Sequence, residues 1–319
     1  MRRLYPCLLW LGAAIAFSVS PAFSQPWSDE GFLVVEQPYS PGVSFTFLGR
    51  SPWLPAPETG AVSVSYTYQT ADEFYFGTSK RPTPGPTSED LVQKTVWVDG
   101  TYGILDSVAL DLRLGFAESD FEVEGGHPAV RKESYSGLAD VNFGVTWRLL
   151  DEVLSDYALM PSVALRAGAI IAGDYQTGYI NSLGDGGDGF EISALAGRFF
   201  ADRFALSGEF GYRNRNDDVP DNLFLRLSAG VSVWDRVGLS VNYERVDTPW
   251  TSFDIGDPGF SPDRFPEVRE EMELIGAGIN WAVSDRVNLV FTYASVIAGR
   301  NTADSDVFSV SLGYSFDVF

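Results

Sequence analysis

The sequence predicts an all-β fold, a transmembrane antiparallel up-and-down β-barrel of about 12 strands. Three observations support this. The last stretch of the chain is Val307–Phe319, and large apolar and small polar residues strictly alternate in it up to Phe316. Similar segments recur from Gly60 onward, and short turns alternate with long polar loops between them. Such alternation gives each strand one apolar and one polar face, as a barrel with lipid outside and water inside requires.

The first 24 residues have the features of a secretory signal peptide. Arg2 and Arg3 precede a short apolar run, and Ala22-Phe23-Ser24 offers a small-x-small cleavage site before Gln25. The single cysteine, Cys7, lies in this segment, so no thiol remains after cleavage. Loss of the two arginines changes the formal net charge from −21 to −23. A chain this acidic argues against a nucleic-acid partner.

Residues 25–59 carry several prolines and no sustained period. We expect an irregular segment on the periplasmic side or folded into the barrel mouth, and a short strand at Val43–Phe47 is an open alternative. The barrel itself is predicted over residues 60–319.

The predicted strands follow one another along the chain. The facing of the sixth strand is left open. Their spans are Val62–Tyr68, Lys94–Tyr102, Val108–Phe116, Val141–Leu149, Leu159–Ala169, Phe190–Phe200, Phe204–Tyr212, Leu223–Val233, Val237–Tyr243, Ile275–Val283, Val287–Tyr293 and Val307–Phe316.

A short turn motif recurs between strands and sets the topology. Asp-Arg, followed by an apolar, a small and a second apolar residue, begins at Asp202, Asp235 and Asp285. Long polar loops separate these copies, as extracellular loops and periplasmic turns alternate in outer-membrane barrels. An even number of strands then places both termini on the periplasmic side. A soluble β-sandwich is the alternative, but it would not require loop lengths to alternate.

The residues on the strand faces opposite the apolar ones are expected to line the lumen. They are small polar residues and charged residues of both signs. One interpretation is structural, because opposite charges buried in a small barrel must pair. The other is a constriction that selects solutes by charge and size. A strongly basic lumen, suited to acidic sugars, is not predicted. The candidate lumen-lining charges are Asp99, Asp111, Arg113, Asp140, Arg148, Arg166, Glu209, Arg213, Arg226 and Glu244.

The sequence predicts no catalytic residue, metal site or cofactor, and hence no enzyme. His127 is the single histidine, and no strand serine stands at a recognisable spacing from it for a hydrolase site. A pairing with an acid from another loop stays open. Asp185, Asp188 and Glu191 could bind calcium, but their spacing differs from an EF-hand and is typical of a flexible turn.

Two stretches carry a family resemblance. Ser136–Gly144, which reads SGLADVNFG, resembles the Gly-Leu-Gly-Asp start of the fourth strand in the outer-membrane family named for the meta-pathway of phenol degradation; Ala139 stands where that glycine is usual. Gly299–Thr302 is similar to the beginning of that family's last hairpin. The resemblance implies a transporter of hydrophobic, often aromatic, small molecules.

We therefore expect a protein of the bacterial outer membrane that acts as a channel or uptake barrel for small hydrophobic or neutral molecules. The alternatives are a non-transporting structural or surface-binding barrel that acts through its extracellular loops and, less favoured, an outer-membrane hydrolase. Expected partners are the lipid bilayer, the outer-membrane assembly machinery and a small solute. The assembly signal is expected at Tyr314, Phe316 and Phe319, with Asp317–Phe319 as an extension or with a bulge near Ser315.

Overall fold

The computed structural model describes residues 17–19, 46–48, 50–82, 90–121, 134–155, 159–178, 181–184, 186–200 and 203–318. Within these residues twelve antiparallel strands form a closed barrel. Pairing of the last strand with the first closes the ring, with Ser311 opposite Ser65. In order around the barrel, the strands are β3 (Thr59–Phe76), β5 (Leu91–Leu105), β6 (Val108–Asp120), β8 (Val141–Leu150), β9 (Ser162–Ile171), β10 (Gly189–Phe200), β11 (Phe204–Arg215), β12 (Asn222–Trp234), β13 (Val237–Asp247), β14 (Glu271–Ala282), β15 (Val287–Arg300) and β16 (Ala303–Asp317).

Three smaller pieces accompany the ring. β4 (Ser79–Pro82) pairs with the end of β3, and β7 (Ser134–Leu138) pairs with the end of β6. The short strands β1 (Phe17–Val19), inside the predicted signal segment, and β2 (Thr46–Leu48), which overlaps the alternative strand at Val43–Phe47, pair with each other. In the described residues no helix is both long and apolar enough to cross a membrane.

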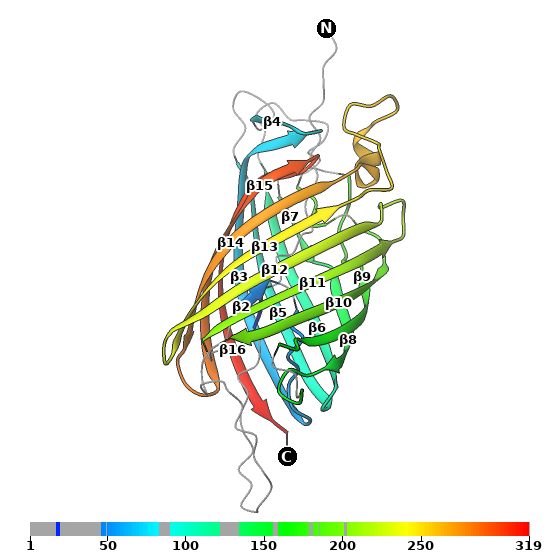
Figure 1. Cartoon of the computed structure of the whole chain (residues 1–319). Coiled ribbons are helices and arrows are strands. Elements are labelled where there is room, and N and C mark those ends of the chain that lie inside the picture. The colour runs from blue at the N-terminus through cyan, green and yellow to red at the C-terminus, as the bar shows by residue number, and fades with distance from the viewer. Residues whose placement is uncertain are drawn as a thin grey trace, which may run out of the picture.

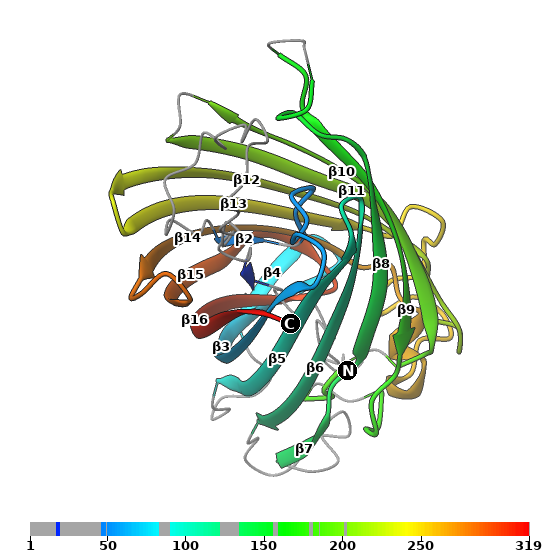
Figure 2. The ribbon, with the colours of Figure 1, turned by 90° about the horizontal axis from the view of Figure 1, so that it is seen from below.

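The strands are strongly tilted, and the two ends of the barrel differ (Figure 1). The end of β16 lies at the bottom together with the short turns, whereas β4 and the 3-10 helix η1 (Pro262–Glu267) lie at the top. Viewed from below, the strands enclose an interior (Figure 2). We refer to the two ends as the turn side and the loop side.

The predicted facing of the strands is confirmed wherever the sequence assigned it. On β16, Phe308, Val310 and Leu312 are exposed, while Ser309 and Ser311 are buried inside. The structure also settles β10, where Phe190 and Ile192 point outward and Glu191, Ser193 and Leu195 point inward. The apolar outer belt matches a bilayer. Two strand limits were wrong. Leu159 lies in a turn, and β9 begins at Ser162, while Val283 lies one residue beyond the end of β14.

Several strands continue beyond the predicted limits on the loop side. β3 has 18 residues, and β15 and β16 have 14 and 15. There the inward positions become apolar and form one cluster, which we call the upper cluster: Tyr75, Met272, Leu274, Ala294, Val296 and Val307. The sequence had suggested a lumen that is polar throughout. The structure shows that it is apolar on the loop side.

The loop between β13 and β14 folds over the loop side with η1 inside it. Phe265 and Val268 of this loop are buried against Phe74, Leu91 and Phe121. We call these five residues the mouth core. Because the mouth core joins a loop to β3 and β5, it holds the loop as a cap on the barrel end.

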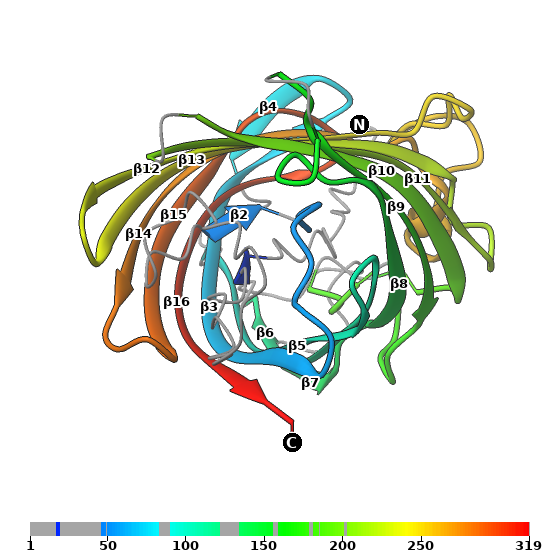
Figure 3. The same cartoon turned by 60° about the horizontal axis from the view of Figure 1, so that its bottom comes forward.

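Residues 50–58 run through the inside of the ring, as the blue strand-free segment in Figure 3 shows. Trp53 and Leu54 are buried, and the Trp53 ring lies 4.4 Å from that of Phe199 on β10. A bridge joins Pro57 to Gly103, where a Cβ would come 2.6 Å from the carbonyl oxygen of Pro55. Glycine at position 103 thus lets the segment pass against the wall. Residues 20–45, which make up most of the predicted irregular segment, lie outside the described residues.

The closing strand stays in register to its end. Phe316 pairs with Gly60 and Asp317 with Thr59, and the single register shift between these strands lies at Asp304 and Ser305. The predicted bulge near Ser315 was therefore wrong, because β3 continues far enough to pair every residue there. The described end is a straight extension, and Phe319 lies outside the described residues.

Candidate functional site

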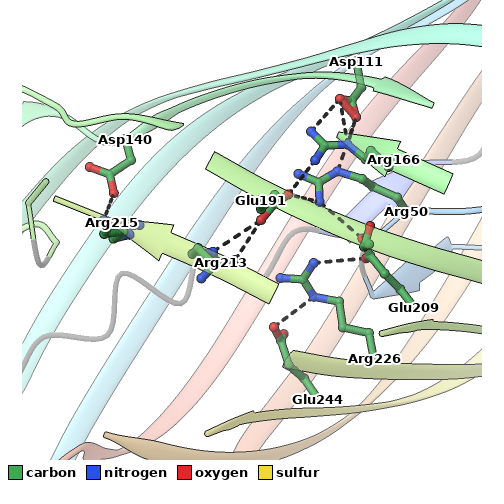
Figure 4. A network of polar contacts seen from close by, with 11 residues as sticks. Arg50, Asp111, Asp140, Arg166, Glu191, Glu209, Arg213, Arg215, Arg226 and Glu244 are labelled. Carbon is green, nitrogen blue, oxygen red and sulfur yellow. Dashed lines mark hydrogen bonds and ion pairs between the residues drawn. The ribbon is translucent and has the colours of Figure 1, made fainter. Parts of the chain in front are cut away.

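Charged side chains from the wall meet inside the barrel and form a network (Figure 4). One row of it crosses three neighbouring strands, with Glu209 on β11, Arg226 on β12 and Glu244 on β13 directly opposite one another. Arg226 donates to Glu244 Oε1 at 2.9 Å and to Glu209 Oε2 at 3.2 Å. Ser193 Oγ on β10 donates to the other oxygen of Glu209 at 2.7 Å. Each charge in this row thus has an opposite neighbour that strand register provides.

A second row depends on two glycines. Asp111 (β6), Gly144 (β8), Gly168 (β9) and Glu191 (β10) are successive neighbours across the wall. Arg166 on β9 lies over both glycines and donates to Asp111 Oδ1 at 2.5 Å and to Glu191 Oε1 at 2.6 Å. Since neither glycine has a side chain, the guanidinium can lie flat between two carboxylates.

Arg50 of the inner segment connects the two rows. It forms ion pairs with Glu191, with Asp111 at 3.3 Å and with Glu209 at 3.4 Å. Arg213 on β11 adds a contact of 3.3 Å to Glu191. Four arginines and four carboxylates therefore share the centre of the barrel: Arg50, Arg166, Arg213, Arg226, Asp111, Glu191, Glu209 and Glu244. We call these eight residues the central network.

Two further ion pairs lie nearby. Arg215 Nη1 is 2.7 Å from Asp140 Oδ2, and Tyr175 also donates to Asp140. Arg113 on β6 lies directly opposite Asp99 on β5, with Arg113 Nε 3.7 Å from Asp99 Oδ1. The latter pair is looser than the central network and has no hydrogen bond among the described residues.

The ten predicted lumen residues are thus placed in different settings. Six of them belong to the central network, together with Arg50 and Glu191: Asp111, Arg166, Glu209, Arg213, Arg226 and Glu244. Asp99 and Arg113 form a pair of their own, and Asp140 pairs with Arg215. Arg148 lies at the turn end of β8, where it contacts Asp151 at 2.9 Å and donates to the carbonyl oxygen of Asp106 at 2.7 Å. It therefore ties a turn rather than joining the network.

Sequence reasoning missed Arg50, Glu191 and Arg215. Arg50 is the single charged residue between Glu36 and Glu58, and an isolated charge in a rather apolar segment was a usable signal. Glu191 was considered for calcium, but its carboxylate lies inside among Arg50, Arg166 and Arg213. His127 and Asp185 lie outside the described residues. Within the described part of the chain, no three acidic or histidine side chains are grouped as metal ligands.

The network has a clear physical consequence. Its equal numbers of opposite charges largely cancel, and each side chain contacts one or more oppositely charged partners within 3.4 Å. Burial of such charges is tolerated because they are paired and hydrogen-bonded. The centre of the barrel therefore holds paired charges of both signs that largely cancel.

The comparisons with known proteins agree with this architecture. Residues 87–312 match the family described as "Putative MetA-pathway of phenol degradation". The chain belongs to this family. Among solved structures, it is similar to an outer-membrane channel from Pseudomonas putida F1, with 15% identity over 82% of this chain and 97% of that one and a TM-score of 0.63. The family is one of outer-membrane β-barrels, and this chain is such a barrel.

More distant likenesses are to a KdgM porin, with 5% identity over 80% of this chain and 99% of that one and a TM-score of 0.46, and to the CymD monoaromatic hydrocarbon channel. For the latter the identity is 11%, the coverage 82% and 90%, and the TM-score 0.40. No curated protein matches the chain.

Proposed function

We propose that this family member is an outer-membrane channel or uptake barrel for small hydrophobic or neutral molecules. The observation that carries the proposal is the apolar inner wall between the mouth core and the central network. Met272, Leu274 and Val296 point inward there and pack in one cluster, so that each is 5% exposed or less. A solute that passes this level would therefore have to part apolar side chains. A hydrophilic solute would lose hydration against such a wall, whereas a hydrophobic one would not.

The central network supports the neutral part of the proposal. An ion that reached it would meet both signs of charge in equal number and would gain little net attraction. An anionic solute would also approach Glu244, directly opposite Leu274, and Glu209, which lies two strands further along the same row. Charge therefore opposes selective passage of ions of either sign.

The test is uptake by intact cells. The barrel is expressed in a bacterial host that lacks its general porins and retains a complete outer membrane, and entry of labelled toluene and labelled gluconate is measured. We expect faster entry of toluene than in cells with the empty vector, and no change for gluconate. Equal toluene entry in both strains, with the barrel shown to be folded in the membrane, would overturn the proposal.

The proposal assigns no enzymatic reaction to the chain. It also includes a partner: the outer-membrane assembly machinery would read the last strand, with Tyr314, Phe316 and Phe319 as the signal. In support, the Tyr314 side chain is exposed on the outer face of β16.

A further inference from the structure

A cavity lies between the inner segment and the wall made by β3, β5, β6 and β8. Its volume is about 110 Å³. Leu54, Pro55, Ala61 and Ala109 give it apolar sides, and Asp99 and Arg113 belong to its lining. A cavity of roughly 150 Å³ is enough to hold benzene in another protein. The space here is smaller than that, which limits its occupant to a single small ring at most.

The Asp99–Arg113 pair of this cavity is unusual among the buried charges. Arg113 is 7% exposed, yet its Nε and Nη1 have no hydrogen-bond partner in the described part of the chain, and neither does Asp99 Oδ2. By contrast, Arg166 and Arg226 each donate to two carboxylates. A buried donor or acceptor without a partner is costly, so such a pair calls for a group that satisfies it.

The position of Arg113 is fixed by an aromatic ring rather than by Asp99. Its guanidinium carbon lies 4.0 Å from the centroid of the Trp97 ring. Trp97 in turn lies opposite Gly115, where a Cβ would come 2.5 Å from Trp97 Cε3. Glycine at position 115 thus makes room for the ring, and stacking on it holds the guanidinium in place. The Asp99 and Arg113 side chains therefore border a small cavity and have hydrogen-bonding capacity left unused.

We infer that this cavity is a binding site for a small neutral molecule that carries a hydroxyl or amide group, recognised by Asp99 and Arg113. A hydroxyl can donate to the Asp99 carboxylate and accept from the Arg113 guanidinium at once. A pure hydrocarbon would leave both groups unpaired. An anion would meet the Asp99 and Asp111 carboxylates, and the arginines of the lining, Arg50, Arg113 and Arg166, already have carboxylate partners. This inference rests on the proposed function and narrows its substrate class.

The test is binding to the purified, full barrel in detergent, followed by 19F NMR with 4-fluorophenol, fluorobenzene and 4-fluorobenzoate as probes. We expect 4-fluorophenol to bind at one site, about tenfold or more tighter than fluorobenzene, because a site built around polar groups rejects a molecule that cannot pair with them. 4-Fluorobenzoate should not displace it. Equal affinity for 4-fluorophenol and fluorobenzene, or tighter binding of 4-fluorobenzoate, would overturn the inference.

The decisive variant is the double replacement Asp99→Leu with Arg113→Met. Replacing both partners leaves no isolated buried charge, so folding should be retained. The preference for 4-fluorophenol should disappear while fluorobenzene binding remains. A matched control is Lys94→Gln with Asp120→Asn, which removes an exposed ion pair from the same two strands, β5 and β6, and should keep the preference. If the double variant does not fold, Asp99→Asn should still weaken 4-fluorophenol binding several-fold.

The outcome is separable from that of the uptake experiment. Selective binding lost in the double variant, together with no toluene uptake by cells, would support the site and overturn the transport proposal. Toluene uptake by cells, together with a preference for 4-fluorophenol that survives the double replacement, would support the transport proposal and overturn the site.

Discussion

The guanidinium of Arg166 lies where a side chain at Gly144 would be. A Cβ at Gly144 would clash with Arg166 Nη2 and would lie 2.5 Å from Asp111 Oδ2. Gly168, the next residue on the same row, leaves equivalent room, since a Cβ there would be 2.6 Å from Arg166 Nη1. The ion pairs across the barrel therefore depend on two residues that have no charge.

We predict that Gly144→Ala breaks the bridge between Asp111 and Glu191. The displaced Arg166 is fully buried, and disruption of a buried charge pair costs about 3–5 kcal/mol. The variant should unfold at lower denaturant concentration and conduct more ions in planar bilayers. Gly100→Ala is the control, because a Cβ at Gly100 meets nothing within 4 Å. If Gly144→Ala and Gly100→Ala behave alike, the glycine requirement is wrong.

Arg50→Ala should loosen the inner segment and open the constriction. Arg50 contributes the ion pairs that tie the segment to Asp111, Glu191 and Glu209. Its removal leaves one excess negative charge in the network, so we expect higher conductance in planar bilayers with a preference for cations. Arg236→Ala is the control, because Arg236 pairs with Asp285 on an exposed turn. Unchanged conductance in Arg50→Ala would show that the segment does not depend on this anchor.

Much of the fold follows from the sequence because each barrel strand separates lipid from lumen. Because one face of each strand meets lipid and the other meets the lumen, apolar and polar residues alternate. This alternation sufficed to place Glu209, Arg226 and Glu244 on inner faces. It gave no answer for β10, where Phe190 and Phe199 put aromatic residues on both faces. Phe199 is there because it packs against Trp53 of the inner segment. The facing of that strand, and with it Glu191, thus depended on a contact distant in sequence.

Arg50 illustrates a second limit. The segment around it has no period, so its path through the barrel is set by contacts such as those of Trp53 and Gly103 rather than by a local pattern. The apolar upper cluster was missed for a related reason. β3 and β15 extend beyond the predicted strand limits on the loop side, where inward positions are apolar and the alternation weakens.

The loop that caps the barrel should be released by acid. Asp254 in this loop accepts hydrogen bonds from Arg300 at 2.9 Å and from Asn301 at 2.7 Å. Burial alone would raise the pKa of Asp254, but these hydrogen bonds outweigh burial and hold the pKa below its ordinary value of 3.8. A carboxylate with a lowered pKa stabilises the folded loop fully above that ordinary value, and the contribution is lost as the pH falls through the lowered pKa.

Hydrogen exchange of the loop, residues 248–270, measures this release. Protection should be constant from pH 7 to pH 5 and should fall below about pH 4, after correction for the intrinsic pH dependence of exchange. In Asp254→Asn the loop should be less protected at pH 7, and this acid-dependent step should be absent. Asp285→Asn, at an exposed turn on the opposite end, should behave like the unchanged protein. Persistence of the step in Asp254→Asn would assign it to another group.

The closing of the barrel should depend on Phe316 more than on the residues that follow it. The Phe316 ring lies across the strand pair against Gly60, where a Cβ would come 2.8 Å from the ring, and register is unbroken up to Asp317. Val318 adds one backbone hydrogen bond, from its N–H to the carbonyl oxygen of Glu58 at 2.8 Å.

We therefore expect removal of Val318 and Phe319 to leave assembly nearly unchanged, and Phe316→Ala to slow it several-fold. The measurement is the rate at which newly made chains become heat-modifiable in gel electrophoresis, with Val283→Ala, exposed next to a turn on the same side of the barrel, as the control. Loss of assembly on removing the last two residues, with Phe316 intact, would place the signal at Phe319 instead.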